Sequence, residues 1–273
     1  MTITALTIAG SDPSGGAGIQ ADLKAMSALG AYGMSVITAL TAQSTRGVAG
    51  VRAVDAGFTR LQLDALLDDI VPDATKIGML ATAELASTVG EYLPALSATV
   101  LDPVMVATSG DRLLDADAVD AVRRLCASAD LITPNLHEAA VLLDEEPVRD
   151  LEGLAAQARR LVERGARRVL VKGGHLDDEA TDVYADGERL ELLRGHRVDT
   201  TSTHGTGCTL SSAIAALSWG RDAEMLGSLM IVALGDRVSA PSAARSSSAR
   251  SKAARMRCAS EISAVPTLTP AAR

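Results

Sequence analysis

The segment HGTGC at residues 204–208 has the residue types of an anion-binding turn. It opens TLSSAIAALSWG, a run of small residues that predicts a helix from about 206 to 219. Successive backbone N–H groups at a helix N-terminus, together with the positive end of the helix dipole, suit a phosphate group. The residues of this turn are Gly205, Thr206, Gly207 and Cys208. The same position is expected to lower the pKa of the Cys208 thiol, which makes Cys208 a candidate base or a member of the anion site. The alternative is a small buried residue at a glycine-rich turn.

Polar side chains follow three apolar segments that are predicted to be strands. Lys172 ends RRVLVK, Asp102 follows VL in VLDPV, and Asn135 and Glu138 follow LITP. An ammonium at a strand end could neutralise phosphate charge, and the oxygen donors of the other three residues suit Mg²⁺ held through its waters. The alternatives are a solvated lysine at Lys172 and a variant capping box at Asn135 and Glu138.

A second glycine-rich turn, AGSDPSGGAG at residues 9–18, lies between a predicted strand and a predicted helix. It matches neither GxGxxG nor the Walker A pattern, so it indicates either a ligand loop or an ordinary tight turn. Gln43 and Met79 are predicted to fall just past strand ends, where an amide and a soft apolar side chain could hold a flat polar ring. The spacing of the four histidines fits no transition-metal site.

These residues require a sheet whose strand ends share one edge. Apolar runs alternate with segments of helical periodicity, which predicts a doubly wound, mostly parallel α/β sheet with helices on both faces. The predicted strands lie near 3–9, 34–40, 74–78, 99–104, 130–133 and 168–172. The predicted helices between them lie near 17–29, 57–71, 82–93, 115–127, 136–143 and 151–164. Asp186-Gly187 between alternating segments predicts an added hairpin within 180–200.

Composition narrows the class of protein. The chain has 273 residues, 47% of them hydrophobic, and a formal net charge of −8. That charge and an aromatic content of 2% argue against a nucleic-acid partner. Three widely spaced cysteines indicate neither disulfides nor zinc, and no apolar run is long enough to span a membrane. The expectation is a cytoplasmic protein with a small-molecule ligand and no membrane partner.

Residues 236–273 differ in character from residues 1–235. They are rich in Ser and Ala and basic, whereas the chain as a whole is acidic. We predict one domain over 1–235 and a divergent tail over 236–273. The tail is interpreted as disordered or as the product of an altered reading frame near 222–236.

Taken together, the motifs resemble a known family. AGSDPSGGAGIQADLKAMSALGAYG, VITALTAQST, TKIGML, LDPVM, ITPNLHEA, VLVKGGH and THGTGCTLSSAIAA, in this order from about residue 3 to 222, are similar to hydroxymethylpyrimidine/phosphomethylpyrimidine kinases. The resemblance implies a ribokinase-like three-layer sandwich and a homodimer. It also implies two successive phosphoryl transfers from ATP, with Mg²⁺, to an aminopyrimidine alcohol in thiamine pyrophosphate synthesis. The tail departs from the family pattern.

The resemblance also implies residue roles. The pyrimidine would be bound by Gln43, Gly10, Ala17, Met79 and Val104. Lys172 would contact the ATP phosphates, and the metal would be organised by Asn135, Glu138 and Asp102. The anion site for the transferring group would consist of Gly205, Thr206, Gly207 and Cys208. Many relatives with this fold have Asp as the base where this chain has Cys208.

Two alternatives remain at this point. A pyridoxal or pyridoxine kinase would accept a flat hydroxymethyl heterocycle of similar size in a related pocket. A non-catalytic pyrimidine-binding protein would follow if the altered C-terminal segment abolished turnover.

Overall fold

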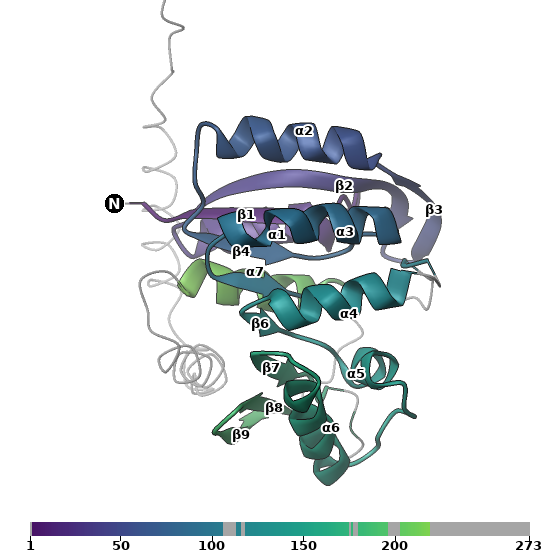
Figure 1. Ribbon diagram of the computed structural model, residues 1–273. Helices are drawn as coiled ribbons and strands as arrows, with labels where there is room; N and C mark the ends of the chain where they lie inside the picture. Colours follow the sequence, from purple (N-terminus) through teal and green to yellow (C-terminus); the bar gives the residue numbers. More distant parts are fainter. Residues whose placement is uncertain are drawn as a thin grey trace, which may run out of the picture. The chain divides into compact units, whose positions relative to one another are not determined.

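A computed structural model describes residues 2–105, 113–115, 118–174, 176, 180–195 and 203–218. Within these ranges the strands form one nine-stranded sheet of order β3-β2-β1-β4-β5-β6-β7-β8-β9 (Figure 1). The strands are β1 (Thr4–Gly10), β2 (Tyr32–Ser44), β3 (Gly47–Ala53), β4 (Ala74–Ile77), β5 (Thr99–Leu101), β6 (Leu131–Ile132), β7 (Arg168–Val171), β8 (Ala180–Asp186) and β9 (Leu190–Gly195). The predicted tail 236–273 lies outside the described residues.

The helices follow the strands in βα order, and most begin at a residue that caps them. Asp55, Thr82, Asn135 and Asp150 each accept a hydrogen bond from a backbone N–H in the first turn of the helix that follows. The helices are α1 (Gly18–Ala28), α2 (Ala56–Leu67), α3 (Ala83–Tyr92), α4 (Val119–Ser128), α5 (Leu136–Leu143), α6 (Leu151–Glu163) and α7 (Thr206–Leu217), with a short 3-10 helix at Leu93–Ala95. All predicted helices in the described ranges are found; α5 has the predicted bounds, and the ends of the others are shifted.

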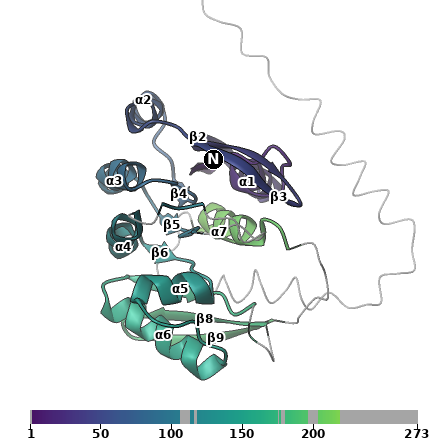
Figure 2. The same ribbon diagram turned by 90° about the vertical axis from the view of Figure 1, so that its right-hand side faces the viewer.

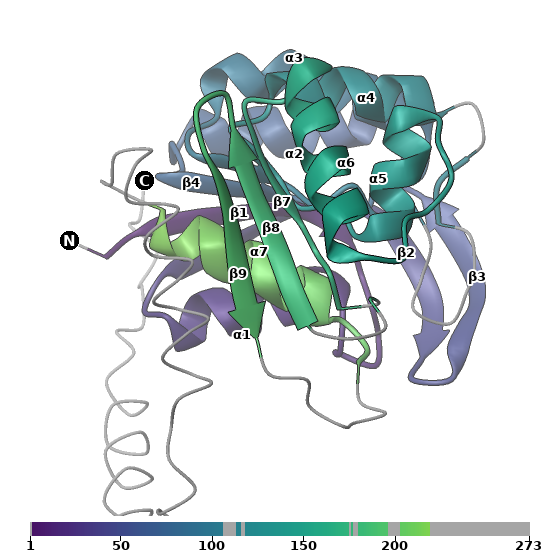
Figure 3. The same cartoon turned by 90° about the horizontal axis from the view of Figure 1, so that it is seen from below.

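The helices cover both faces of the sheet. Helices α1 and α7 pack together on one face, and α2, α3 and α4 lie on the other (Figure 2). The view from below shows α5 and α6 on the same side as α2, α3 and α4 (Figure 3). The predicted three-layer α/β architecture is therefore confirmed.

The apolar core follows these layers. The larger cluster packs α2 to α6 against the sheet and includes Leu6, Ile8, Leu85 and Leu125. On the opposite face two smaller clusters combine large side chains such as Tyr184 with alanines of α7, Ala215 and Ala216. Small residues in α7 allow its backbone to approach the sheet closely, which brings its first turn toward the strand ends.

The sheet is parallel in the middle and antiparallel at both margins. β1 pairs in parallel with β2 and β4, and the parallel ladder continues through β7. The predicted hairpin is found as β8 and β9, of which β8 also pairs antiparallel with β7. β3, for which the sequence gives no clear signal, pairs antiparallel with β2.

One placement from the sequence is wrong. Gln43 is expected to follow a strand end, but β2 continues to Ser44 and Gln43 lies within it. The strand is longer because its second half leaves the parallel ladder and pairs with β3, where Gln43 is opposite Val48. An exposed antiparallel strand such as β3 leaves only a weak apolar pattern in the sequence, because most of its residues are solvent-exposed.

Among the described helices, none is long and apolar enough to cross a membrane.

Candidate active site

One cavity of about 820 Å³ lies where the carboxyl ends of the central strands meet the start of α7. Every residue predicted to carry chemistry or to bind a ligand lines it: Gly10, Ala17, Gln43, Met79, Asp102, Val104, Asn135, Glu138, Lys172, Gly205, Thr206, Gly207 and Cys208. In open parallel sheets, ligands bind outside the carboxyl ends of the strands. The cavity therefore occupies the position that the strand-end argument predicts.

Three adjacent parallel strands place the polar side chains of this cavity. Asp102 directly follows β5, Asn135 lies three residues after β6, and Lys172 directly follows β7. The backbone of Lys172 continues the ladder, because its N–H donates to the carbonyl of Pro134 at 2.8 Å. Since β5, β6 and β7 are neighbours in one parallel ladder, their following residues meet at one edge.

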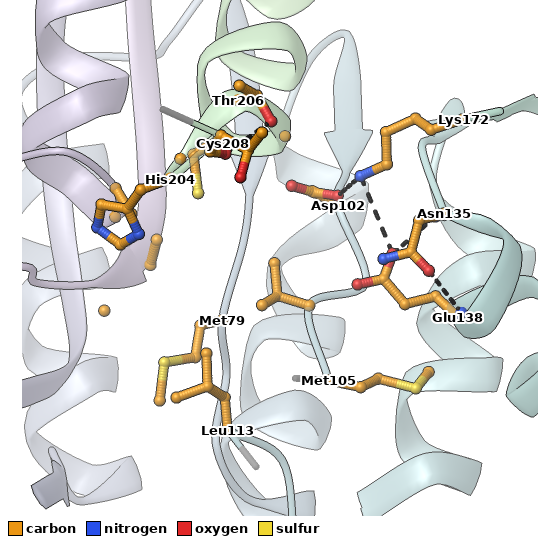
Figure 4. A pocket seen from close by; sticks show the side chains of 18 of the residues that line it. Met79, Asp102, Met105, Leu113, Asn135, Glu138, Lys172, His204, Thr206 and Cys208 are labelled. Atoms are coloured by element: carbon orange, nitrogen blue, oxygen red, sulfur yellow. Dashed lines mark hydrogen bonds and ion pairs between the residues drawn. The ribbon is translucent and has the colours of Figure 1, made fainter. Parts of the chain in front are cut away.

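The Lys172 ammonium is held by two carboxylates. Its Nζ lies 2.8 Å from Asp102 Oδ1 and 3.9 Å from Glu138 Oε2 (Figure 4). Burial would lower the pKa of Lys172, but Asp102 and Glu138 raise it, so the group stays positively charged. A Cβ added at Gly207 would lie 3.1 Å from Lys172 Nζ and 3.3 Å from Asp102 Oδ2. The ion pair therefore lies directly against the first turn of α7.

Asn135 and Glu138 form a complete capping box at the start of α5. Asn135 Oδ1 accepts hydrogen bonds from the N–H groups of His137 and Glu138, and Glu138 Oε2 accepts from the Asn135 N–H. The capping-box alternative is thus confirmed. The box also turns the Glu138 carboxyl toward Lys172, where burial raises the pKa of Glu138 to about 7 although Lys172 lowers it.

The oxygen atoms on the cavity wall suit magnesium, but they do not form a metal centre made of protein side chains alone. Among the described residues, no group of three or more His, Cys, Asp or Glu side chains has the arrangement of a metal centre. Mg²⁺ commonly keeps several waters and binds through one or two carboxylates together with substrate phosphates. Asp102 and Glu138, which both line the cavity beside Lys172, fit that mode.

The turn before α7 brings two helix starts together. Gly205 has φ +74°, and a Cβ on it would lie 1.7 Å from the carbonyl oxygen of Gly16. Only glycine fits there, because the left-handed backbone and the contact both exclude a side chain. Gly205 and Gly16 thereby join α7 to the loop that precedes α1, and the N-terminal residues of both helices line the cavity. The first N–H groups of each helix have no carbonyl partner within the helix, so the two starts suit an anion.

Cys208 lies in the first turn of α7 and is half-buried in the cavity wall. The expectation that this position lowers its pKa is wrong. Burial raises the pKa of the Cys208 thiol, while the charge of Lys76 and the N–H of Gly18 lower it without compensating fully. Burial is the largest effect, and the negative charges of Asp22 and Asp102 raise the pKa of the thiol further.

Asp12 and His204 form a contact that the sequence does not reveal. The buried Asp12 carboxylate accepts hydrogen bonds from the N–H groups of Ser14, Gly16 and Ala17, and its Oδ2 lies 2.8 Å from His204 Nε2. This single carboxylate therefore shapes the loop before α1 and joins it to the turn before α7. An Asp two residues before a Ser is a known local signal for a turn. Its contact with His204 has no such signal, because His204 lies 192 positions away.

Replacing Asp12 by asparagine is expected to destabilise the protein in a pH-dependent way. Burial would raise the pKa of Asp12, but hydrogen bonds from Ser14 and His204 outweigh it and lower the pKa from 3.8 to about 2. The stabilisation is therefore present above about pH 4 and is lost as the pH falls toward 2. Asp12→Asn should lower the free energy of unfolding at pH 7 by about 2 kcal/mol. Denaturant unfolding between about pH 7 and 2.5 should show the two proteins converging at the acid end. Curves that stay parallel would contradict this role.

The apolar part of the cavity lies away from Lys172. Met79 and Leu113 lie close together on that side (Figure 4). A Cβ at Gly10 would approach Met79 Sδ to 3.1 Å, so the absence of a side chain at residue 10 leaves room beside the thioether. Gln43, Ala17 and Val104 complete the predicted group on the cavity wall. The cavity thus combines an apolar region with a charged region near α7.

Two solved structures that are similar to this chain are small-molecule kinases. The phosphomethylpyrimidine kinase of Clostridium difficile 630 has a TM-score of 0.75 and 38% identity, covering 87% of this chain and 100% of that chain. The pyridoxal kinase of Staphylococcus aureus, solved with AMP-PCP and pyridoxal, has a TM-score of 0.76 and 34% identity, covering 84% and 85%. With the cavity described above, these similarities place the chain among the small-molecule kinases of ribokinase-like fold.

The sequence comparison specifies the family. A family model described as phosphomethylpyrimidine kinase matches residues 12–224, and the chain belongs to this family. The hydroxymethylpyrimidine/phosphomethylpyrimidine kinase of Escherichia coli strain K12 is 53% identical over 219 residues, 79% of this chain and 82% of that protein. The resemblance stated from the motifs is therefore confirmed.

Proposed function

We propose that the chain transfers the γ-phosphoryl group of ATP to the hydroxymethyl group of 4-amino-5-hydroxymethyl-2-methylpyrimidine, and then phosphorylates the resulting monophosphate, as a step in thiamine pyrophosphate biosynthesis. The main support is that one cavity contains both the predicted ring-binding residues and the charged groups beside α7. The names of the similar proteins support the same substrate.

Positioning of the two substrates and stabilisation of the phosphoryl charge would supply most of the rate enhancement. Gln43 would hydrogen-bond the aminopyrimidine, with Met79 against the ring. In the transfer, the hydroxymethyl oxygen bonds to the γ-phosphorus, the bond from that phosphorus to the β,γ-bridging oxygen breaks, and ADP leaves. Lys172 would neutralise charge on the phosphoryl oxygens, and the N–H groups of Gly207 and Cys208 would bind them. Asp102 and Glu138, with Asn135, would hold Mg²⁺ through its waters, and that ion would offset phosphate charge.

Cys208 is the proposed acceptor of the hydroxyl proton. Its thiol is close to the positive charge of Lys76 and the N–H of Gly18, both of which favour the thiolate. A general base is effective when its charged form is accessible near the working pH. These two groups offset only part of the effect of burial, which still raises the pKa of the thiol. The support for Cys208 as the base is therefore its place in the first turn of α7 on the cavity wall, at the position where many relatives have Asp.

Product analysis tests the proposal. Incubation of the full chain with the pyrimidine alcohol, ATP and Mg²⁺ should give first the monophosphate and then the diphosphate, which phosphorus NMR distinguishes. Formation of neither product, with ADP released only at the rate of a protein-free control, would contradict the proposal and favour a non-catalytic pyrimidine-binding protein.

A pyridoxine or pyridoxal kinase is the second candidate, and the similarity to the Staphylococcus aureus pyridoxal kinase favours it. The higher identity to pyrimidine kinases and the presence of Gln43 and Met79 in the cavity support the pyrimidine. In one ATP-dependent assay, kcat/KM for the pyrimidine alcohol should exceed that for pyridoxine. A preference of about tenfold for pyridoxine would reverse the assignment.

The family resemblance further supports a cytoplasmic enzyme that acts as a homodimer. Light scattering on purified protein should give the mass of two chains. The mass of one chain would contradict the homodimer without affecting the proposed reaction.

A further inference from the structure

Lys76 and Asp22 form a fully buried ion pair next to the active site. Both side chains are 0% exposed, and Lys76 Nζ lies 2.7 Å from Asp22 Oδ2. Lys76 is on β4 and Asp22 is on α1. Burying two charges costs several kcal/mol per ion, and a pair of apolar residues often stabilises a fold as well or better. The stability of the fold alone therefore gives little reason for charges at these two positions.

Asp22 is fixed by donors from three elements. Its Oδ2 accepts from Thr7 Oγ1 of β1 at 2.6 Å as well as from Lys76, and its Oδ1 accepts from Ser212 Oγ of α7 at 2.7 Å. Ser212 lies four residues after Cys208, so both residues lie on the same side of α7. The network thus connects Lys76 to the helix whose first turn contains the proposed base.

Lys76 also reaches the cavity itself. It is one of the residues that line it, and a Cβ added at Gly78 would lie 2.7 Å from Lys76 Nζ. Burial would lower the pKa of Lys76, but negative charge at Cys208, Asp22 and Asp102 raises it, so the ammonium persists. The charged groups around Cys208 are Lys76 of β4, Asp22 of α1, Asp102 after β5 and Lys172 after β7.

We propose that Lys76 is a positioning residue for phosphoryl transfer: fixed by Asp22, its ammonium supports negative charge on Cys208 and, through Asp22 and Ser212, keeps the first turn of α7 in place. The inference rests on the proposed function, because it assumes that Cys208 takes the hydroxyl proton. The arrangement needs no reorganisation during the reaction, which is how fixed charges contribute most to catalysis.

The first test measures Cys208 without any substrate. The rate of alkylation by iodoacetamide is followed against pH, and peptide mass spectrometry separates Cys208 from Cys126 and Cys258. Lys76→Met should move the midpoint of the Cys208 profile up by about one pH unit, and Lys76→Arg should restore most of it. Because Lys76→Met leaves Asp22 buried without its ion-pair partner, the double variant Asp22→Asn/Lys76→Met provides a neutral pair of similar shape. Its midpoint should shift in the same direction but less, since the opposing charge of Asp22 is also removed.

The second test is a double-mutant cycle in the kinase assay. Lys76→Met, or the neutral double variant if the single one does not fold, should lower kcat about tenfold or more with little change in the KM for the pyrimidine. In a Cys208→Ala background the same change should have much less effect, because Lys76 acts through Cys208. An unchanged alkylation profile in both variants, or equal losses of kcat in the two backgrounds, would overturn the inference. Inactive wild-type protein with the expected alkylation shifts would instead contradict the proposed function.

Discussion

Replacing Gly205 by alanine is expected to remove most of the kinase activity and to lower the thermal stability. The new Cβ would lie 1.7 Å from the carbonyl oxygen of Gly16, in a residue with φ +74°. A left-handed backbone costs about 1–2 kcal/mol for a residue with a side chain, and the contact forces the two joined segments apart. The first turn of α7 supplies the N–H groups of the proposed anion site, so kcat/KM should fall by about 10²-fold or more, as on loss of such donors elsewhere. Tm should fall by about 5 °C or more.

The matched control for this variant is Gly187→Ala. Gly187 lies in the turn between β8 and β9, and a Cβ there would meet no atom within 4 Å. This variant should keep wild-type activity and nearly wild-type Tm. Equal behaviour of Gly205→Ala and Gly187→Ala in the coupled ADP-release assay would show that the contact with Gly16 does not shape the site.

Replacing Lys172 by methionine should lower kcat by about 10²–10³-fold while leaving pyrimidine binding nearly unchanged. The methionine keeps much of the length of the side chain but removes the ammonium that lies 2.8 Å from Asp102 and next to Gly207. Gln43 lies in β2 and Met79 follows β4, whereas Lys172 follows β7, so the affinity for the pyrimidine should be retained. Isothermal titration with the pyrimidine and steady-state kinetics measure the two effects separately.

Arg60→Met is the control for loss of a cationic side chain. Arg60 is paired with Glu91 on the exposed surface at 2.7 Å, and such pairs contribute little. Its kcat should equal that of the wild type. If Lys172→Met also keeps wild-type kcat, Lys172 has no part in the transfer.

The sequence predicted the residues of the site best where a residue lies just after a buried parallel strand. Lys172, Asp102 and Asn135 could be placed at one sheet edge because the carboxyl ends of neighbouring parallel strands coincide. Gly205 could be recognised as special because a glycine-rich turn that opens a helix is typical of an anion site. Spacing alone did not give the roles of these residues. The resemblance to a kinase family supplied them.

Other features depended on contacts between distant segments. Nothing local distinguishes the pairing of Asp12 with His204 or of Lys76 with Asp22, because each partner is found only when the layers pack. A lysine within the short apolar strand ATKI was the one available sign of a buried charge. The pKa of Cys208 was predicted in the wrong direction because local reasoning counted the helix start but not the burial and the carboxylates around it.

The most direct test of phosphoryl transfer in this cavity is a crystal structure of the full chain with the pyrimidine alcohol, Mg²⁺ and a non-hydrolysable ATP analogue. We expect the γ-phosphate to lie in hydrogen-bond contact with Lys172 Nζ and with the N–H groups of Gly207 and Cys208, with the hydroxymethyl group facing it. A γ-phosphate bound away from Lys172 and from the first turn of α7 would contradict the assignment of this cavity to the reaction.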